Sequence, residues 1–496
     1  MEEIQNLKTK AINGTIWKFL ERFFAQGISF IVSIVLARIL MPKDYGVVSI
    51  VAIFFAFANV LISGGLNAAL IQKKKADPED YSTVLYVSLA ISFIVYVILY
   101  KFAPQIAVAY DQPLLTNVIR VMALILPINA VKSIYCAYIS STLQFRKFFF
   151  ATLGGTVVSG AVGIVMALKG YGAWALIAQQ MINAIVDTII LIFVAKLRLV
   201  FRFSRERLKS LWQYGWKVFV SSLVNTGYHQ ARPLFVGLRF TSIDLSYYTK
   251  GSSIPNLISD TTTNTLSSVF FAVMSKHQDN KEKLLSWTRW FIKITSFVAF
   301  PCMLGLFAVS DNLILVLLTD KWIEASFYLK VFSITGMFTM INIGNCETIK
   351  AMGRSDIYLR MEIIKKSLYF VILAIFMFLS KDPHVLAISG FFTTAVAIIV
   401  NSIPNRRLIN YKFKDQVWDI CVNLIPATIM CVAVYFIGYI PIKITWLLLV
   451  IQIVSGIIIY FAIVFITKNK SLHFIVDYIK TIIKNRKSNK KQAIAK

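Results

Sequence analysis

The chain has 496 residues, of which 57% are hydrophobic and only 15% are charged, and its mean hydropathy is +0.68. Soluble globular domains carry about a quarter of charged residues, so this composition excludes an ordinary soluble protein. The formal net charge of +28 at pH 7 has to be explained by where lysine and arginine lie along the chain.

Long apolar stretches recur from one end of the chain to the other. A helix needs about twenty mostly apolar residues to cross the hydrocarbon core, where its backbone groups have no water to bond. In chain order, the predicted spans are 12–38, 46–70, 83–103, 116–141, 150–168, 171–195, 212–240, 246–275, 287–318, 325–352, 356–380, 384–404, 417–438 and 443–467. The sequence therefore predicts an all-α integral membrane protein with about fourteen transmembrane helices.

Lysine and arginine fall in alternate gaps between these spans. One set of gaps holds the clusters at 73–75, 196–209 and 406–414, and the basic tail at 468–496 belongs to the same set. The other gaps hold little more than single lysines, several of them beside acids. Because cytoplasmic loops retain positive charge, we expect both termini in the cytoplasm. The net charge then forms a collar against anionic lipid headgroups and requires no nucleic acid.

Several function classes lack their sequence signals. No gap is long enough for a soluble domain, and no GxxxxGK[ST] phosphate loop is present. A membrane glycosyltransferase would need paired carboxylates in a sizeable external loop, and a channel would show an arginine ladder or a filter sequence. The five cysteines have no metal spacing. We therefore expect a secondary transporter rather than an enzyme, without cofactor or metal.

The first and seventh spans share a layout that indicates an internal repeat. When Gly14 is aligned with Gly215, Arg38 falls on Arg239, and a Trp-Lys pair follows each glycine closely. A repeat of six spans is even, so both halves enter the membrane from the same side and are related by an axis along its normal. Chance similarity between apolar helices is the alternative explanation.

The repeat predicts three parts of the chain. Residues 1–211 form an N-terminal lobe of spans one to six with the linking cytoplasmic loop, and residues 212–414 form a C-terminal lobe of spans seven to twelve. Residues 415–496 hold two extra spans and the basic cytoplasmic tail. Two six-helix lobes would enclose a central cavity.

Ionisable residues within the spans are the candidate functional groups. A charge at the bilayer centre costs at least about 2.5 kcal/mol, so it usually faces a wet cavity or a partner. Cations outnumber acids here, and arginine matches phosphate oxygens well, which favours a phosphorylated anionic substrate. The predicted substrate-binding cations are Arg22, Lys132, His229 and Arg232. The candidates for ion coupling are Glu21 and Asp260. Helix packing and pairing with neighbouring helices are the alternative roles for all six.

The first seventy residues carry short motifs. They are LARIL at 36–40, PKDYG at 42–46, Gly65-Leu66 and ALIQ at 69–72, and the later segment YYTKG follows the seventh span. In these motifs the chain resembles bacterial polysaccharide flippases of the multidrug/oligosaccharidyl-lipid/polysaccharide exporter (MOP) superfamily. The span number extends the resemblance over the whole chain. The turn at 42–46 marks membership and has no implied binding role.

The resemblance implies fourteen helices in two lobes that open alternately to either side of a bacterial inner membrane. The implied cargo is an oligosaccharide repeat unit on polyprenyl diphosphate, flipped for O-antigen (lipopolysaccharide), capsule or exopolysaccharide biosynthesis. The expected partners are this lipid-linked oligosaccharide and membrane lipids, with a polysaccharide polymerase or glycosyltransferases as protein partners in the same pathway. Two lobes in one chain make a monomer sufficient.

Three other functions compete with this interpretation. A cation-coupled multidrug exporter of the same superfamily would need acids to dominate the lobe interiors, whereas cations outnumber them here. A membrane glycosyltransferase or polymerase would need the missing external acid cluster. A scaffold without transport would gain no benefit from cations placed deep in its spans.

Overall fold

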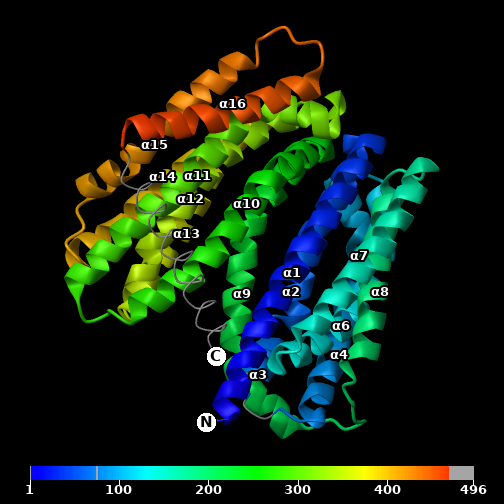
Figure 1. Cartoon of the computed structure of the whole chain (residues 1–496). Coiled ribbons are helices and arrows are strands. Elements are labelled where there is room, and N and C mark those ends of the chain that lie inside the picture. Colours follow the sequence, from blue (N-terminus) through cyan, green and yellow to red (C-terminus); the bar gives the residue numbers. More distant parts are fainter. Residues whose placement is uncertain (1, 74–75, 469–496) are drawn as a thin grey trace, which may run out of the picture. The chain divides into compact units, whose positions relative to one another are not determined.

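The computed structural model describes residues 2–73 and 76–468. The side chains of residues 2–16, of Lys18, Phe19 and Arg22, and of several residues between 264 and 272 lie outside the described part. The described residues form helices joined by short connections and contain no β-strand (Figure 1). The chain divides into two compact units, Met1–Ser246 and Tyr247–Lys496.

The first unit is a bundle of long helices with three shorter ones. Its helices are α1 (Glu2–Ile39), α2 (Pro42–Ser63), α3 (Leu66–Gln72), α4 (Pro78–Ala109), α5 (Leu114–Met122), α6 (Ile125–Ser141), α7 (Phe145–Leu168), α8 (Ala173–Ala195) and α9 (Arg205–Arg239). Helix α7 packs against both α1 and α8, and α6 packs against α4 and α8 (Figure 1). The long helices thereby surround a common interior.

The second unit is also helical. Its helices are α10 (Ser242–Ser275), whose first turn belongs to the first unit, α11 (Lys281–Leu318), α12 (Ala325–Ala351), α13 (Ser355–Leu379), α14 (Pro383–Leu408), α15 (Phe413–Ile437) and α16 (Thr445–Ile466). Helix α11 packs against α12, α15 and α16. A buried apolar cluster of this unit includes Phe300, Met303 and Met430 from these packed helices.

Each predicted span coincides with one long helix, except for two that the structure divides. The stretch 46–70 becomes α2 and α3, which separate at Gly64 and Gly65, where a side chain on Gly65 would overlap the backbone of Gly215 in α9. The stretch 116–141 becomes α5 and α6. Pro127 lies at the start of α6, and proline lacks an N–H group and clashes with the carbonyl four residues earlier, which explains this break.

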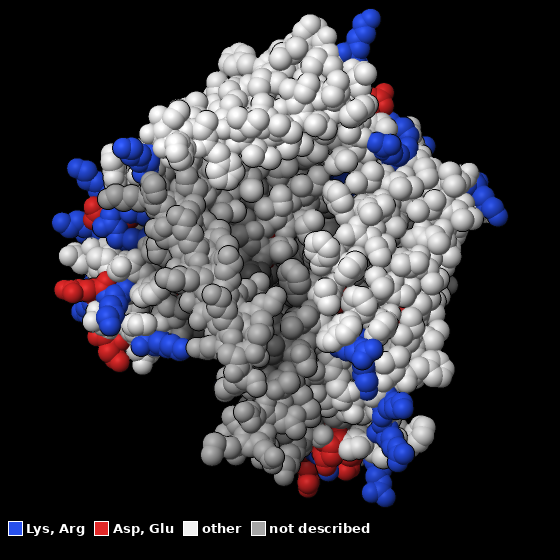
Figure 2. Space-filling view, viewed as in Figure 1, with Lys and Arg blue, Asp and Glu red and all other residues white. Residues whose placement is uncertain are grey.

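Ten segments of the described chain are long and apolar enough to cross a membrane. They confirm a multi-pass membrane protein by length and composition. The long helices α1, α9, α10 and α13 are not among these segments, and the described part of α1 contributes a shorter apolar stretch, Phe23–Ile39. These four helices contain many of the charged and hydroxyl residues of the predicted spans. The total of fourteen spans therefore stays a prediction. In Figure 2, most charged side chains of the described residues lie toward the edges of the face shown.

The turns that join α1 to α2 and α9 to α10 are built alike. The backbone N–H of Met41 donates to Asp44 Oδ2 at 3.0 Å, and the backbone N–H of Thr241 donates to Asp244 Oδ2 at 3.0 Å. Each aspartate thus caps the helix that follows, where a negative charge is favourable. This shared cap extends the layout found in the first and seventh spans.

The unit boundary differs from the predicted lobe boundary. Helix α9, which the sequence assigns to the second lobe at residue 212, packs against α2, α3 and α4 of the first unit. A close glycine contact allows this packing, because a side chain on Gly65 would overlap the backbone of Gly215 in α9. At the start of α10, a side chain on Gly46 would likewise overlap the backbone of Ser242. The functional lobe boundaries stay a prediction.

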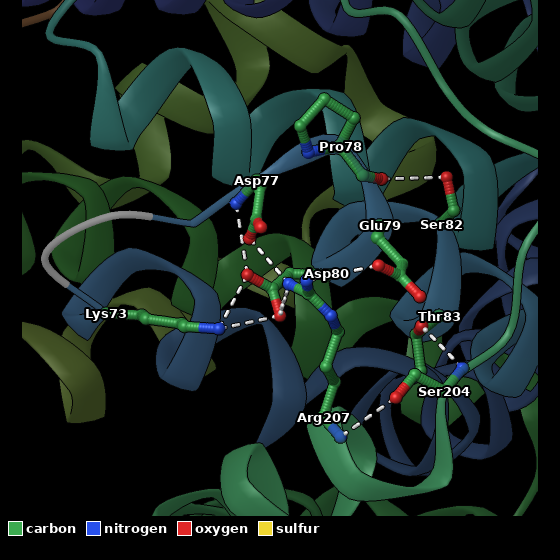
Figure 3. A network of polar contacts seen from close by, with 9 residues as sticks. All are labelled: Lys73, Asp77, Pro78, Glu79, Asp80, Ser82, Thr83, Ser204 and Arg207. Atoms are coloured by element: carbon green, nitrogen blue, oxygen red, sulfur yellow. Dashed lines mark hydrogen bonds and ion pairs between the residues drawn. The ribbon is translucent and has the colours of Figure 1, made fainter.

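A network of charged side chains fastens the segment before α4 to the start of α9 (Figure 3). Arg207 approaches Asp77 at 2.6 Å, Glu79 at 3.1 Å and Asp80 at 3.2 Å, and Lys73 Nζ lies 2.6 Å from Asp80 Oδ2. Hydrogen bonding with Asp80 and with the Arg207 guanidinium holds the pKa of Asp77 well below its usual range. Two segments that the charge pattern assigns to one side of the membrane are therefore in contact.

Candidate functional site

A cavity of about 820 Å³ lies within the first unit. Its walls come from the middle of α1 and α2, from the adjoining ends of α5 and α6, and from α7 and α8. Ligand sites commonly have volumes of about 300–1,000 Å³. The size is therefore sufficient for a substantial headgroup rather than a single ion.

The cavity wall is rich in amides and hydroxyls. The amides are Gln26, Asn59, Asn129, Gln179, Gln180 and Asn183, and the hydroxyls are Ser29, Thr152, Thr156 and Ser159. Asn129 Nδ2 donates to Asn59 Oδ1 at 3.1 Å. Each amide can both donate and accept, so most of this wall retains hydrogen-bonding capacity toward a ligand. An apolar substrate would leave that capacity unused.

One ion pair lies in the cavity wall. Lys132 Nζ in α6 lies 2.7 Å from Asp187 Oδ2 in α8, and the side chains of Lys132 and Asp187 are 29% and 4% exposed. The second carboxylate oxygen, Asp187 Oδ1, accepts no hydrogen bond from the described residues. Burying an unbonded acceptor is unfavourable. Asp187 therefore has bonding capacity that its surroundings within the described chain do not use.

Small residues on α7 make room for this arrangement. A side chain on Gly155 would overlap the carboxylate of Asp187, and a side chain on Gly160 would meet Val32 of α1 at 2.7 Å. A side chain on Gly163 would meet Gln179 of α8 at 3.0 Å. Close helix contacts in membranes commonly use such small residues. The glycine spacing along α7 thus sets how near α1 and α8 approach, and with it the shape of the cavity.

The structure brings together two of the six predicted site residues. Glu21 and Lys132 both line the cavity. His229 and Arg232 lie on α9, outside the helices that line it; His229 is exposed beside the ring of Tyr228, and Arg232 is buried. The side chain of Arg22 lies outside the described part of the chain, and Asp260 is exposed on α10 in the second unit.

The amides are the residues that sequence reasoning missed. Attention to ionisable groups identified Lys132, but Asn59, Asn129 and Asn183 carry no charge and were passed over. A usable signal existed, because uncharged polar side chains in mid-span also require partners. The six amide side chains of the cavity wall lie on four spans, and this concentration is visible in the sequence.

The second unit holds a cavity of different character. It has a volume of about 470 Å³ and is lined mainly by apolar residues of α11, α15 and α16, including Met430 and Tyr460. Gly305 and Gly456 widen it. The amide of Gln452 in its wall is engaged, accepting from Asn312 at 2.8 Å and donating to the Val434 carbonyl at 3.0 Å. This cavity suits a hydrocarbon ligand.

A buried acid in the second unit is fully bonded. Asp419 in α15 accepts from Arg289 Nε at 2.7 Å, from Lys293 Nζ at 3.0 Å and from the Tyr411 hydroxyl at 2.9 Å. Its side chain is 0% exposed. Several donors on two oxygens leave little capacity for a ligand. The cluster joins α11 to α15 and is structural.

Comparison with known sequences gives the family. Residues 35–327 match the family of polysaccharide biosynthesis proteins. The succinoglycan biosynthesis transport protein ExoT of Rhizobium meliloti is 24% identical over 62% of this chain and 63% of its own length, so the match spans less than two thirds of that relative. The lipopolysaccharide biosynthesis protein WzxC of Escherichia coli is 20% identical over 73% of this chain and 74% of its own length.

Comparison with solved structures gives the fold. The lipid II flippase MurJ in an inward closed conformation superposes with a TM-score of 0.72, covering 91% of this chain and 98% of that one at 14% identity. An inward-facing multidrug resistance MATE family transporter of the MOP superfamily superposes with a TM-score of 0.60, covering 79% of this chain and 99% of that one at 14% identity. These likenesses agree with the motifs at 36–72. The chain therefore belongs to the polysaccharide biosynthesis protein family, as its motifs predicted, and shares its fold with the flippase MurJ and with the MATE family transporter.

Proposed function

We propose that the chain is a flippase that moves an oligosaccharide repeat unit linked to polyprenyl diphosphate across the membrane. The observation that carries the proposal is the 820 Å³ cavity of amides and hydroxyls inside an otherwise apolar bundle. Sugar hydroxyls donate and accept hydrogen bonds, as amides do. A polar headgroup that must cross hydrocarbon needs such a wall to replace the water it loses.

The apolar cavity of the second unit supports the same cargo. A polyprenyl chain is a long hydrocarbon, and Met430 and Tyr460 offer an apolar wall between α11, α15 and α16. The names of the relatives place them in succinoglycan and lipopolysaccharide biosynthesis. The first cavity suits a sugar head and the second suits a hydrocarbon, each taken within its own unit.

The diphosphate requires cations as well. Arg22, Lys132, His229 and Arg232 stay the proposed contacts for it, with Lys132 in the cavity wall and His229 and Arg232 on α9. Glu21 and Asp260 stay the proposed sites of coupling to protons or sodium. Alternating access of two lobes would carry the headgroup, while membrane potential acting on an anionic cargo adds a driving force.

We further propose the bacterial inner membrane as the location, with both termini in the cytoplasm. The positive-inside pattern supports this orientation. So do the ion pairs of Asp80 with Lys73 and with Arg207, because they join two segments that the pattern assigns to the cytoplasmic side (Figure 3). Polymerase or glycosyltransferase partners and a monomeric state belong to the same proposal.

A cation-coupled drug exporter is the second candidate function. Two carboxylates in the cavity wall, Glu21 and Asp187, favour it, as does the likeness to a MATE family transporter. The pairing of Asp187 with Lys132 at 2.7 Å weakens this case, because it neutralises one of the two acids.

Leaflet-resolved lipid analysis separates the two functions. In cells lacking the gene, a flippase predicts that polyprenyl-diphosphate oligosaccharide accumulates on the cytoplasmic face and that wild-type protein relieves it. The Arg22→Ala/Arg232→Ala double mutant should insert normally and fail to relieve it. Asp311→Asn, at a pair with Lys330 outside both cavities, is the matched control. Absence of any accumulation, with export of organic cations instead, would establish the drug exporter.

A further inference from the structure

We propose that the cavity of the first unit selects saccharides with uncharged sugars over those with uronic acids. This inference rests on the proposed flippase function and names the class of headgroup that the same cavity takes. It comes from the balance of donors, acceptors and charges in the wall.

The wall offers hydrogen bonds in both directions. Amides such as Asn129, Gln179 and Asn183 donate and accept, and hydroxyl groups of a neutral sugar do the same. Acetamido groups on amino sugars would pair with the same amides. A neutral saccharide can therefore satisfy this wall without bringing any net charge into the membrane interior.

The buried carboxylate of Asp187 favours a cargo that donates a hydrogen bond to it. Its side chain is 4% exposed, it lines the cavity, and among the described residues Lys132 is the one donor to its carboxylate, through Oδ2. An ionised carboxylate only accepts. A sugar hydroxyl can donate to it, whereas the carboxylate of a uronic acid cannot.

The charges of the described wall also oppose a uronate. Glu21 and Asp187 both contribute carboxylates, and Lys132 already lies 2.7 Å from Asp187. Lys132 is the cation that the described wall offers to the diphosphate, so a uronate beside it would meet Glu21 and Asp187 with no further cation of the described wall to balance its charge. Like-charge contacts in a desolvated site are strongly unfavourable, so the cavity discriminates by repulsion as well as by fit.

The test uses purified full-length protein in vesicles of neutral lipid with two synthetic cargoes. Both carry the same polyprenyl diphosphate and disaccharide core, and they end in glucose or in glucuronic acid. Transport is measured at pH 7 under an imposed membrane potential and pH gradient of either sign. We expect the lipid that ends in glucose to be transported at least about tenfold faster than the one that ends in glucuronic acid. Only the glucuronate brings a negative charge close to the carboxylates of the cavity wall.

Two variants of cavity residues test whether the cavity causes the selectivity. Asp187→Asn supplies an amide donor and releases Lys132 from its ion pair. The ratio of the transport rate of the glucose lipid to that of the glucuronic acid lipid should therefore fall to about twofold or reverse. Glu21→Gln, which leaves the pair intact, should lower the ratio by a smaller factor and serves if Asp187→Asn does not fold. Asp311→Asn, at an ion pair with Lys330 away from the cavity, should keep the wild-type ratio.

Each remaining outcome is decisive. Equal rates for the two cargoes with wild-type protein, or an unchanged ratio in both folded cavity variants, would overturn the selectivity and leave flipping intact. Movement of neither cargo by folded wild-type protein would contradict the flippase function itself, and the selectivity would fall with it.

Discussion

Two buried aspartates, one in each unit, have opposite surroundings. Asp419 in the second unit receives bonds from Arg289, Lys293 and Tyr411, which occupy both of its oxygens. Asp187 in the first unit has one cationic partner, Lys132, and one oxygen that accepts no bond from the described residues. Both side chains are buried: the exposed fraction is 0% for Asp419 and 4% for Asp187.

The difference shows which buried charge is structural and which one is available to a ligand. A carboxylate with every acceptor occupied joins helices and gains little from a substrate. A carboxylate that lines a cavity and has a single donor, as Asp187 does, can accept a further hydrogen bond from a ligand there. Burial alone would place Asp419 and Asp187 in one class, whereas the number of their donors separates them.

The largest effect is expected from Asp419→Ala. Removing this acid leaves Arg289 and Lys293 close together without their counter-ion, and breaking a buried ion pair costs about 3–5 kcal/mol. Thermal unfolding of the purified protein in detergent should show a large fall in midpoint, with transport lost in proportion to folded protein. A folded variant of wild-type stability that fails only in transport would show that Asp419 belongs to the binding site.

Asp187→Ala should be less severe for stability and more severe for transport. Only one cation, Lys132, loses its partner there, whereas Arg289 and Lys293 both lose theirs at Asp419, so we expect a loss of about 3 kcal/mol, at the lower end for such pairs. The double variant Lys132→Met/Asp187→Leu should regain most of that stability, since no charge remains unpaired. Its transport should nevertheless stay impaired. Full transport by the stable double variant would exclude the pair from cargo binding.

A smaller effect is expected from Gly155→Ala. The added methyl group would overlap the Asp187 carboxylate and should displace it, with a loss of about 1–3 kcal/mol for overpacking. Gly154→Ala is the matched control, because its methyl group meets only the end of the flexible Ile190 side chain. The two unfolding midpoints, measured side by side, should differ clearly. Equal midpoints would mean that the close contact of α7 with α8 tolerates a side chain.

The smallest effect is expected from Arg354→Ala. Arg354 and Asp356 form a bonded pair at 2.9 Å, but their side chains are 47% and 52% exposed, and exposed pairs contribute little to stability. Neither the unfolding midpoint nor transport should change measurably. A marked loss of either would show that charge pairing in the second unit matters outside its buried cluster.

Much of the helical architecture could be predicted from the sequence, because apolar length and charge placement are local signals. The divisions at Gly64 and near Pro127 were not predicted, although both residues are recognisable helix breakers. The packing of α9 and of the start of α10 in the first unit depends on contacts of Gly65 and Gly46 with residues about 150 to 200 positions away. No local signal encodes such contacts.

The candidate site could be predicted only in part. Lys132 and Glu21 were found because charges in apolar spans are conspicuous. Pairing Lys132 with Asp187, 55 residues further along, requires knowing that α6 packs on α8. The amides of Asn129 and Gln179 were missed because uncharged side chains stand out less in a membrane span.

The most direct test of a headgroup site in the first unit is photo-crosslinking with a cargo lipid whose sugar carries a diazirine. Purified protein in vesicles would be irradiated, digested and mapped by mass spectrometry. A saccharide site predicts labels on cavity residues such as Asn129 and Gln179, and competition by unlabelled lipid-linked saccharide. Labels confined to helices of the second unit, with the cavity unlabelled, would contradict it.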